Sequence, residues 1–347
     1  MCAACITTAF FTYKSRSQPS YHGRALSAWL VDVRSSNASA RSDSAQAVRK
    51  LDESAVPYLI AELNHRDGFL KSKLLIARKT FPSLLGSVRP AQDHHSDAVA
   101  ALILLRPLSP NAIKALSPHL LSTNAGVAAF KALIPPRNDY PLRVELAEPL
   151  VLALKSADRR VRFNAAAAMQ RLPLDHPLAV AALQQSLSDA DTGCRKIAAL
   201  SLTKICSDPA ILVSAHVTFF GTGDVGAQHL ALRALAQLGT NAAPAIPLLL
   251  GVAKAESTEL RRLAVSALGQ IHSEGERVIP ILIARLEDND PHVRKNAAVA
   301  LEAYGGQATN AIPVLLKADA DNDRSAGDAA TRALNVISKL VQRSPSP

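Results

Sequence analysis

The stretch FFGTGDVGAQHLALRALAQLG, residues 219–239, contains Gly221, Gly223 and Gly226 in the G-x-G-x-x-G spacing of a dinucleotide-binding turn. In such a turn the glycines let the backbone approach a pyrophosphate at the start of a helix, and an acidic residue about 20 positions further on binds the ribose. The first acidic residue after Gly226 is Glu256, 30 positions away. The spacing therefore lacks the residue that a dinucleotide needs, and we expect no bound cofactor.

The histidines and cysteines do not have the spacing of a metal or catalytic site. No two of the ten histidines lie three or four positions apart, the spacing that would place both imidazoles on one face of a helix. His94 and His95 are adjacent, so they point in different directions. Cys194 and Cys206 fall inside apolar helical patterns, and no disulfide framework is indicated. We expect no metal ion, no catalytic residue and no enzyme activity.

The net charge of +10 is concentrated in the N-terminal part of the chain. Residues 1–157 carry 19 Lys and Arg against 11 Asp and Glu, whereas residues 158–347 carry 20 against 18. Part of the excess lies in RDGFLKSKLLIARK, residues 66–79. A basic surface attracts nucleic acid, anionic lipid or an acidic protein, and the simpler interpretation is a solvated helix face.

The chain opens with MCAACITTAFFTYKSR, an apolar stretch followed by two cations. A membrane span needs about 20 apolar residues, so this stretch is too short to be one. It also lacks the basic start of a signal peptide. We expect a cytoplasmic chain without a transmembrane span, in which residues 1–20 are a tail. The alternative is the remnant of an N-terminal membrane anchor or export signal.

An internal repeat of 33 residues runs through residues 158–341. In each repeat, an Asp or Ser precedes an apolar run, where it caps a helix by accepting backbone N–H groups that have no partner inside the helix. Alanine and leucine columns then form one helical stripe. Another helix in each repeat has Pro near its start, where the missing N–H costs little. The expected N-caps are Asp158, Asp191, Asp224, Ser257, Asp290 and Asp323.

Each repeat is therefore expected to be a helical hairpin, and stacked hairpins bury stripes that no single hairpin can bury. The predicted fold is all-α, a right-handed α-α superhelix or α-solenoid. We expect an N-terminal cap and degenerate repeats over 21–157, regular repeats over 158–341 and a disordered tail over 342–347. In this register ILVSAHVTFF (211–220) is a helix, so the three glycines mark a turn between two helices.

The segments AIPVLL (311–316) and DNDPHVRKNAAVALEAYGG (288–306) resemble HEAT repeats, particularly the short bacterial type known from phycobilin lyases. The resemblance implies a non-catalytic scaffold that binds a protein partner on the concave face of the solenoid. It also implies a structural arginine that bonds turn aspartates between repeats. The arginines at that position are Arg162, Arg195, Arg261 and Arg294.

If these arginine-bearing helices line the concave side, as in HEAT proteins, the next position forms a mostly basic column that we call the ladder. The ladder suits an acidic segment of a protein or peptide. One alternative ligand is the phosphate backbone of a nucleic acid, which the ladder would bind together with the basic N-terminal half of the chain. The other alternative is that the ladder is only the solvated edge of the helical stripe and binds nothing. Lyase-like or chaperone-like activity is a more distant alternative, and we expect a monomer. The ladder consists of Phe163, Lys196, His229, Arg262 and Lys295.

Overall fold

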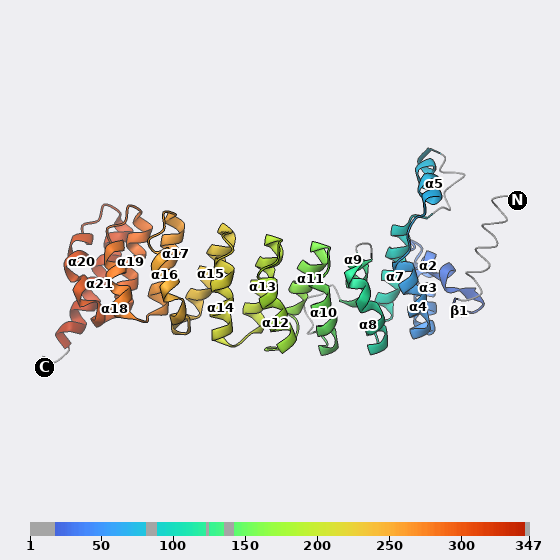
Figure 1. The fold of residues 1–347 in the computed structure, drawn as a ribbon, viewed down its shortest axis with the longest axis horizontal. Coiled ribbons are helices and arrows are strands. Elements are labelled where there is room, and N and C mark those ends of the chain that lie inside the picture. The colour runs from blue at the N-terminus through green and yellow to red at the C-terminus, as the bar shows by residue number, and fades with distance from the viewer. Residues whose placement is uncertain (1–17, 81–88, 123–124, 135–141, 344–347) are drawn as a thin grey trace. The chain divides into compact units, whose positions relative to one another are not determined.

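The computed structural model describes residues 18–80, 89–122, 125–134 and 142–343. The chain forms two units, Met1–Pro173 and Leu174–Pro347, and each is built of successive helical hairpins (Figure 1). Within the described ranges, no helix has the length and apolar character that a membrane span requires. Residues 1–17 and 344–347, which include most of the two expected tails, lie outside the described residues.

The first unit begins with a short β-hairpin, a departure from a purely helical chain. Its strands β1 (Ser20–Tyr21) and β2 (Arg24–Ala25) pair antiparallel. His22 and Gly23 between them both have positive φ, which is typical of a two-residue type I′ turn. The helices that follow are α2 (Leu26–Asp32), α3 (Ala38–Leu51), α4 (Val56–Leu63), α5 (Phe69–Thr80), α7 (Ala91–Leu104), α8 (Pro110–Leu116), α9 (Gly126–Leu133), α10 (Ala147–Ala153) and α11 (Arg159–Met169).

Helix α2 packs on α3 at the N-terminal end of the first unit. Leu26 and Leu30 are buried, while Trp29 is half-buried. The Trp29 indole N–H donates to the carbonyl of Tyr21 at 3.3 Å, and the guanidinium of Arg24 lies 4.2 Å from the indole ring. The tryptophan therefore joins the β-hairpin to the first helices, the kind of atypical end layer that a solenoid needs.

The second unit repeats the same hairpin in regular register. The first helix of each hairpin has Pro at one of its first two positions in α12, α14, α16 and α20, and the second helix has a side-chain N-cap. The exception is α18, which begins at Gly275, so that Pro280 lies inside the helix and not near its start as expected. Short 3-10 segments, η4 (Gly239–Ala245) and η5 (Gly305–Ala311), precede two of the first helices. The helices are α12 (Pro177–Ser186), α13 (Thr192–Ile205), α14 (Pro209–Phe220), α15 (Val225–Gln237), α16 (Ile246–Val252), α17 (Thr258–Ile271), α18 (Gly275–Arg285), α19 (Pro291–Tyr304), α20 (Ile312–Ala318) and α21 (Arg324–Arg343).

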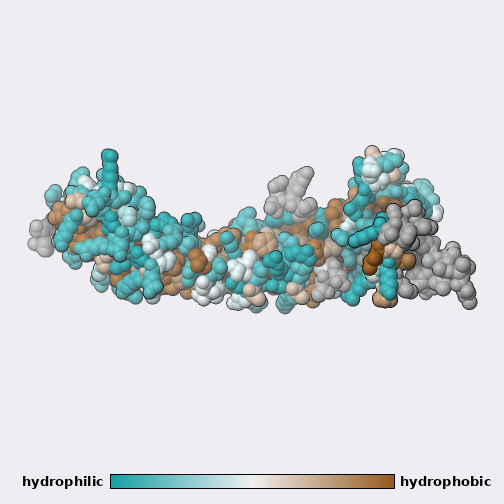
Figure 2. Space-filling view, turned by 90° about the horizontal axis from the view of Figure 1, so that it is seen from above, coloured by the Kyte–Doolittle hydropathy of each residue, from teal (hydrophilic) through white to brown (hydrophobic). Residues whose placement is uncertain are grey.

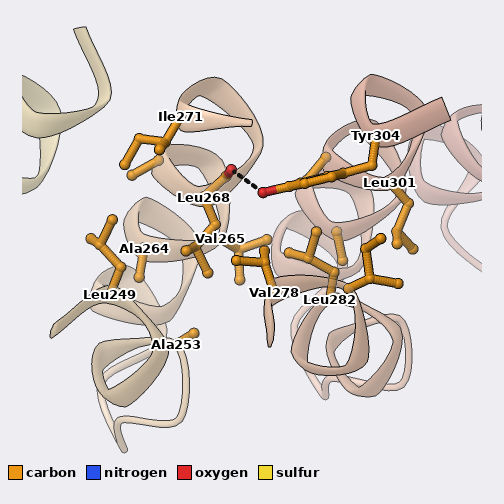
Figure 3. Packing of buried hydrophobic residues seen from close by; sticks show 14 of the residues in the cluster. Leu249, Ala253, Ala264, Val265, Leu268, Ile271, Val278, Leu282, Leu301 and Tyr304 are labelled. Carbon is orange, nitrogen blue, oxygen red and sulfur yellow. Dashed lines mark hydrogen bonds between the residues drawn. The ribbon is translucent and has the colours of Figure 1, made fainter. Parts of the chain in front are cut away.

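The alanine and leucine columns form the core of the second unit. Helices α15, α17, α19 and α21 pack side by side in chain order. Ala264, Leu268 and Leu301 are fully buried between them (Figure 3). At Gly269 an added Cβ would lie 2.7 Å from the Cβ of Ala300, so the backbones of α17 and α19 approach too closely for any side chain there. The small residues of the stripe thus set the spacing between repeats.

Tyr304 connects two repeats through its hydroxyl. The hydroxyl donates to the carbonyl of Ser273 at 2.7 Å and accepts from the Ser273 N–H at 3.1 Å. The carbonyl of Leu268 lies 3.3 Å from the same hydroxyl (Figure 3). The ring also contacts His272, which ends α17 with positive φ. Tyr304 therefore satisfies backbone groups that the end of α17 leaves open.

Helix α21 extends two residues into the segment 342–347 that we expected to be a tail, because it ends at Arg343. Ile337 on this helix is fully buried, and the side chain of Leu340 lies against Gly305 and Gly306. Apolar contacts with the preceding repeat thus keep the chain helical further than the repeat register alone indicates.

Leu268→Ala tests the core. Leu268 is fully buried, so its truncation is expected to lower the free energy of unfolding by about 2–5 kcal/mol through the lost contacts and the cavity. Urea denaturation followed by circular dichroism measures this loss. Val299→Ala is the control, because Val299 on α19 is exposed and should change stability by less than about 0.5 kcal/mol. Equal, small losses in both variants would contradict the packing.

Candidate functional site

The glycine-rich stretch is a joint between two helices. The segment before it is helix α14, which confirms the helix expected at 211–220 and leaves the strand of a dinucleotide fold missing. Gly221 ends α14, and Gly223 has a φ of +75°, a conformation that favours glycine. Asp224 then accepts the N–H of Ala227 at 2.8 Å. The three glycines shape a turn, and the acidic side chain caps the next helix.

The structure places each of the other expected N-cap residues just before a helix, with its side-chain oxygen accepting a backbone N–H. The distances are those of ordinary hydrogen bonds, with Ser257 at the long end. The donors are Arg160 N to Asp158 (2.8 Å), Cys194 N to Asp191 (3.0 Å), Leu260 N to Ser257 (3.5 Å), His292 N and Val293 N to Asp290 (2.9 and 3.1 Å) and Ala326 N to Asp323 (2.9 Å).

The four expected structural arginines all hold the turn before their own helix. In the last of them, Nη1 of Arg294 donates to the carbonyls of Asp288 (2.8 Å) and Asn289 (3.2 Å). These contacts satisfy carbonyls in a turn that has no other regular partner. The equivalent pairs are Arg162 with Ser156 and Ala157, Arg195 with Asp189 and Ala190, and Arg261 with Ala255 and Glu256.

Arg261 and Arg294 also bind an aspartate of the following repeat, and we call these contacts the Arg–Asp bridges. Arg261 binds Asp288 through Nε and Nη2, both at 2.9 Å. Arg294 binds Asp321 through the same two nitrogens at 2.6 and 2.8 Å. Both pairs are bidentate and largely shielded from solvent, the geometry in which an Arg–carboxylate contact is strongest.

The bridges change the titration of both aspartates. The hydrogen bond from Arg294 holds the pKa of Asp321 below its usual value. Burial by itself would raise the pKa of Asp288, but the hydrogen bond from Arg261, helped by the N–H of Asp290, outweighs it and the pKa is lowered. Both carboxylates are therefore ionised at neutral pH and bind the guanidinium groups as charged pairs.

The bridge is missing at the glycine-rich joint. Thr222 stands at the repeat position that Asp288 and Asp321 occupy further on, and its hydroxyl donates to the carbonyl of Phe219 instead. The Nε of Arg195 is buried without a hydrogen-bond partner among the described residues. Helix α13 packs on α12 and α14 but not along α15, whereas α15 packs along α17 and α17 along α19. The repeats of α13 and α15 are therefore less tightly coupled than the repeats that follow.

The following repeat lacks both partners of a bridge. Gln228 replaces the arginine, and Ala255 replaces the aspartate 27 positions later. Neither substitution leaves a charge without its partner. The break in the series of bridges thus spans the two repeats on either side of α15, and α15 packs on α17 through a shared apolar core without a bridge.

The structure brings together three of the five ladder residues. His229, Arg262 and Lys295 lie on α15, α17 and α19, which pack side by side, and all three are half-buried. Lys196 is exposed on α13, on the other side of the loosely coupled joint. Phe163 belongs to α11 in the first unit and is exposed. In Figure 2 the visible surface over the C-terminal repeats is largely hydrophilic.

The ladder also contains an acidic partner that the column-by-column analysis missed. Glu259 lies three residues before Arg262 and accepts from its Nε at 2.8 Å and from its Nη2. The hydrogen bond from Arg262 is the main reason that the pKa of Glu259 is lowered, and His229 and Arg233 lower it further. The signal was present in the sequence as an i, i+3 acid–base pair. One carboxylate is thus surrounded by three basic side chains.

Several histidines make polar contacts that spacing alone does not reveal. His94 and His95 do project to different partners: Nδ1 of His94 lies 2.7 Å from the buried carboxylate of Glu62, and Nε2 of His95 lies 2.9 Å from the carbonyl of His65. Burial lowers the pKa of His216 to about 4. In the described part of the chain, no three His, Cys, Asp or Glu side chains are grouped so that they could hold a metal ion.

Thr222→Asp tests the missing bridge. The new carboxylate is expected to accept from Arg195 Nε and to raise the free energy of unfolding by about 1 kcal/mol. Hydrogen exchange at 221–226, expected to be faster than at 287–292 in the wild type, should slow in the variant. Thr222→Asn, which has the shape without the charge, is the control. A gain equal in both variants, or unchanged exchange, would contradict this account.

Acidification tests the two existing bridges. Because the pKa values of Asp288 and Asp321 are lowered in the folded state, their stabilisation is present above the unfolded pKa of about 3.9 and is lost as pH falls through the folded pKa. Asp288→Asn/Asp321→Asn should therefore be less stable than the wild type at neutral pH. Urea midpoints should converge as the pH falls below about 4. A constant difference across this range would contradict the assignment.

Comparison with known proteins supports the repeat architecture. The HEAT repeats family model matches residues 246–335, which include α17 to α20 and the two Arg–Asp bridges. No curated protein matches the chain.

Among solved structures, a crystal structure of importin β has a TM-score of 0.52 and 15% sequence identity, and the match covers 92% of this chain and 47% of that one. This chain therefore spans about half of that importin β chain. An engineered protein matches with a TM-score of 0.47 and 20% identity over 90% of this chain and 88% of its own. A designed armadillo repeat protein matches with a TM-score of 0.42 and 18% identity, over 55% and 99%. The protein has the α-solenoid fold, with HEAT repeats matched over residues 246–335.

Proposed function

We propose that the chain is a non-catalytic scaffold that binds a protein or peptide partner through the ladder face of its second unit. The observation that carries the proposal is the row of half-buried basic side chains on α15, α17 and α19, three helices held at fixed spacing by a shared core. Fixed spacing allows several partner residues to be bound at once without ordering the surface first. The concave position of this face rests on the resemblance to HEAT repeats.

The charges of the row support an acidic segment as the ligand. Glu259 is surrounded by His229, Arg233 and Arg262, and Lys295 lies one repeat further on. This group has an excess of positive charge even with Glu259 included. Arg262 is already oriented by its contacts with Glu259, so a partner carboxylate can bind the row without first ordering that side chain.

The same acidic residue makes a nucleic-acid backbone a poorer ligand. A phosphate chain carries closely spaced negative charges, and Glu259 lies in the middle of the row that would have to bind them. Nucleic-acid binding is the alternative that salt titration detects, because affinity for a phosphate backbone falls steeply as salt rises.

We also propose a cytoplasmic monomer with repeats of the phycobilin-lyase type, without lyase activity.

Reversal of the ladder charges tests the proposed face. Lys196→Glu/Arg262→Glu/Lys295→Glu should lose partners that the wild type captures in affinity purification with mass spectrometry, while its thermal unfolding stays cooperative. The control is Lys254→Glu/Lys317→Glu/Lys339→Glu, which changes the net charge equally at exposed lysines outside the ladder. Recovery of the same partners from the ladder variant, or their loss from both variants, would refute the ladder as the binding site.

A further inference from the structure

Helix α5 stands apart from the other helices of the first unit (Figure 1). It lies between α4 and α7 in the sequence, but α4 and α7 pack directly on one another. No other described element packs along α5. Helices α4 and α7 therefore form their contact without α5, which is an inserted arm relative to the described core of the first unit.

The arm exposes large apolar side chains to water. Phe69 is 73% exposed and Ile76 is 69% exposed, and Leu74 is also exposed. A helix of about 12 residues is marginal in water without tertiary packing, and exposed apolar side chains add nothing to its stability. The described residues supply no apolar surface that covers the arm, so its exposed side chains suit contact with another surface.

The exposed face is also basic. Lys73 and Lys79 are exposed and, at positions four and ten after Phe69, lie on the same side of the helix as Phe69 and Ile76. The ammonium of Lys73 is 4.6 Å from the Phe69 ring. The helix contains four cations and no acidic residue. At its base, Lys71 binds Asp67 at 3.0 Å, a local i, i+4 ion pair.

We propose that α5 docks on the surface of an anionic lipid bilayer. Phe69 and Ile76 enter the boundary between headgroups and acyl chains, and the ammonium groups of Lys73 and Lys79 bind headgroup phosphates. The lysine stems lie along the apolar face while their charged ends reach the headgroups. A nucleic-acid backbone would satisfy the lysines but would leave Ile76 in water, so the lipid surface fits the whole face better.

The arm does not depend on the ladder face for this role. The proposed docking surface lies in the first unit, whereas the described ladder residues other than Phe163 lie in the second. A scaffold attached in this way would hold its partner near a membrane. Failure of lipid binding would therefore leave the proposed partner binding untouched, and the converse also holds.

Vesicle flotation with the full chain tests the proposal. Binding is expected to equimolar phosphatidylglycerol and phosphatidylcholine vesicles and not to pure phosphatidylcholine vesicles. Both Phe69→Ser/Ile76→Ser and Lys73→Glu/Lys79→Glu should reduce binding about tenfold or more. The matched control is Leu174→Ser/Val225→Ser, because Leu174 and Val225 are 68% and 63% exposed but lie outside the arm. This control should bind like the wild type.

Hydrogen exchange identifies the surface involved. Anionic vesicles should slow exchange at residues 69–80 of the full chain and leave the exchange of α17 and α19 unchanged. The proposal is overturned if anionic vesicles do not bind, or if Phe69→Ser/Ile76→Ser binds as well as the wild type. It is also overturned if duplex DNA or polyglutamate protects residues 69–80 while the vesicles do not.

Discussion

Each helix of the repeats carries an apolar stripe that only a neighbouring hairpin can cover. Alanine and glycine at the contact allow the backbones to approach, as between Gly269 and Ala300, and leucine fills the space one turn away. The rest of the structure follows from this requirement, since every hairpin is stable only beside another and the ends need special layers. At the N-terminal end, Trp29 and the β-hairpin provide such a layer.

Polar contacts between neighbouring repeats fix the orientation of one hairpin relative to the next. The Arg–Asp bridges fix one turn to the next at Asp288 and Asp321, and Tyr304 binds the backbone at the end of α17. They hold groups that apolar packing cannot orient, because hydrogen bonds require defined geometry. Where Thr222 stands in place of the aspartate, the Arg–Asp bridge between the two turns is lost, although helices α14 and α15 on either side are intact.

The 33-residue columns were sufficient to predict the buried leucines such as Leu268 and the capping role of Asp224, because both depend on local periodicity. Two features had signals in the sequence that column analysis did not use: Thr222 breaks the aspartate column, and Glu259 stands three residues before Arg262. The isolation of α5 had no such signal. Its residues predict a helix, but whether a helix is packed depends on contacts that its own sequence does not encode.

The weak coupling between α13 and α15 gives the second unit unequal bending stiffness. Helices α14 to α21 contribute to one core, which includes Val213 on α14, whereas α13 does not pack along α15 and no Arg–Asp bridge joins the repeats of these two helices. Strain imposed by a long partner would therefore concentrate between α13 and α14 as a change of local curvature. The spacing of binding groups on α15, α17 and α19 would be preserved while Lys196 changes its distance from them.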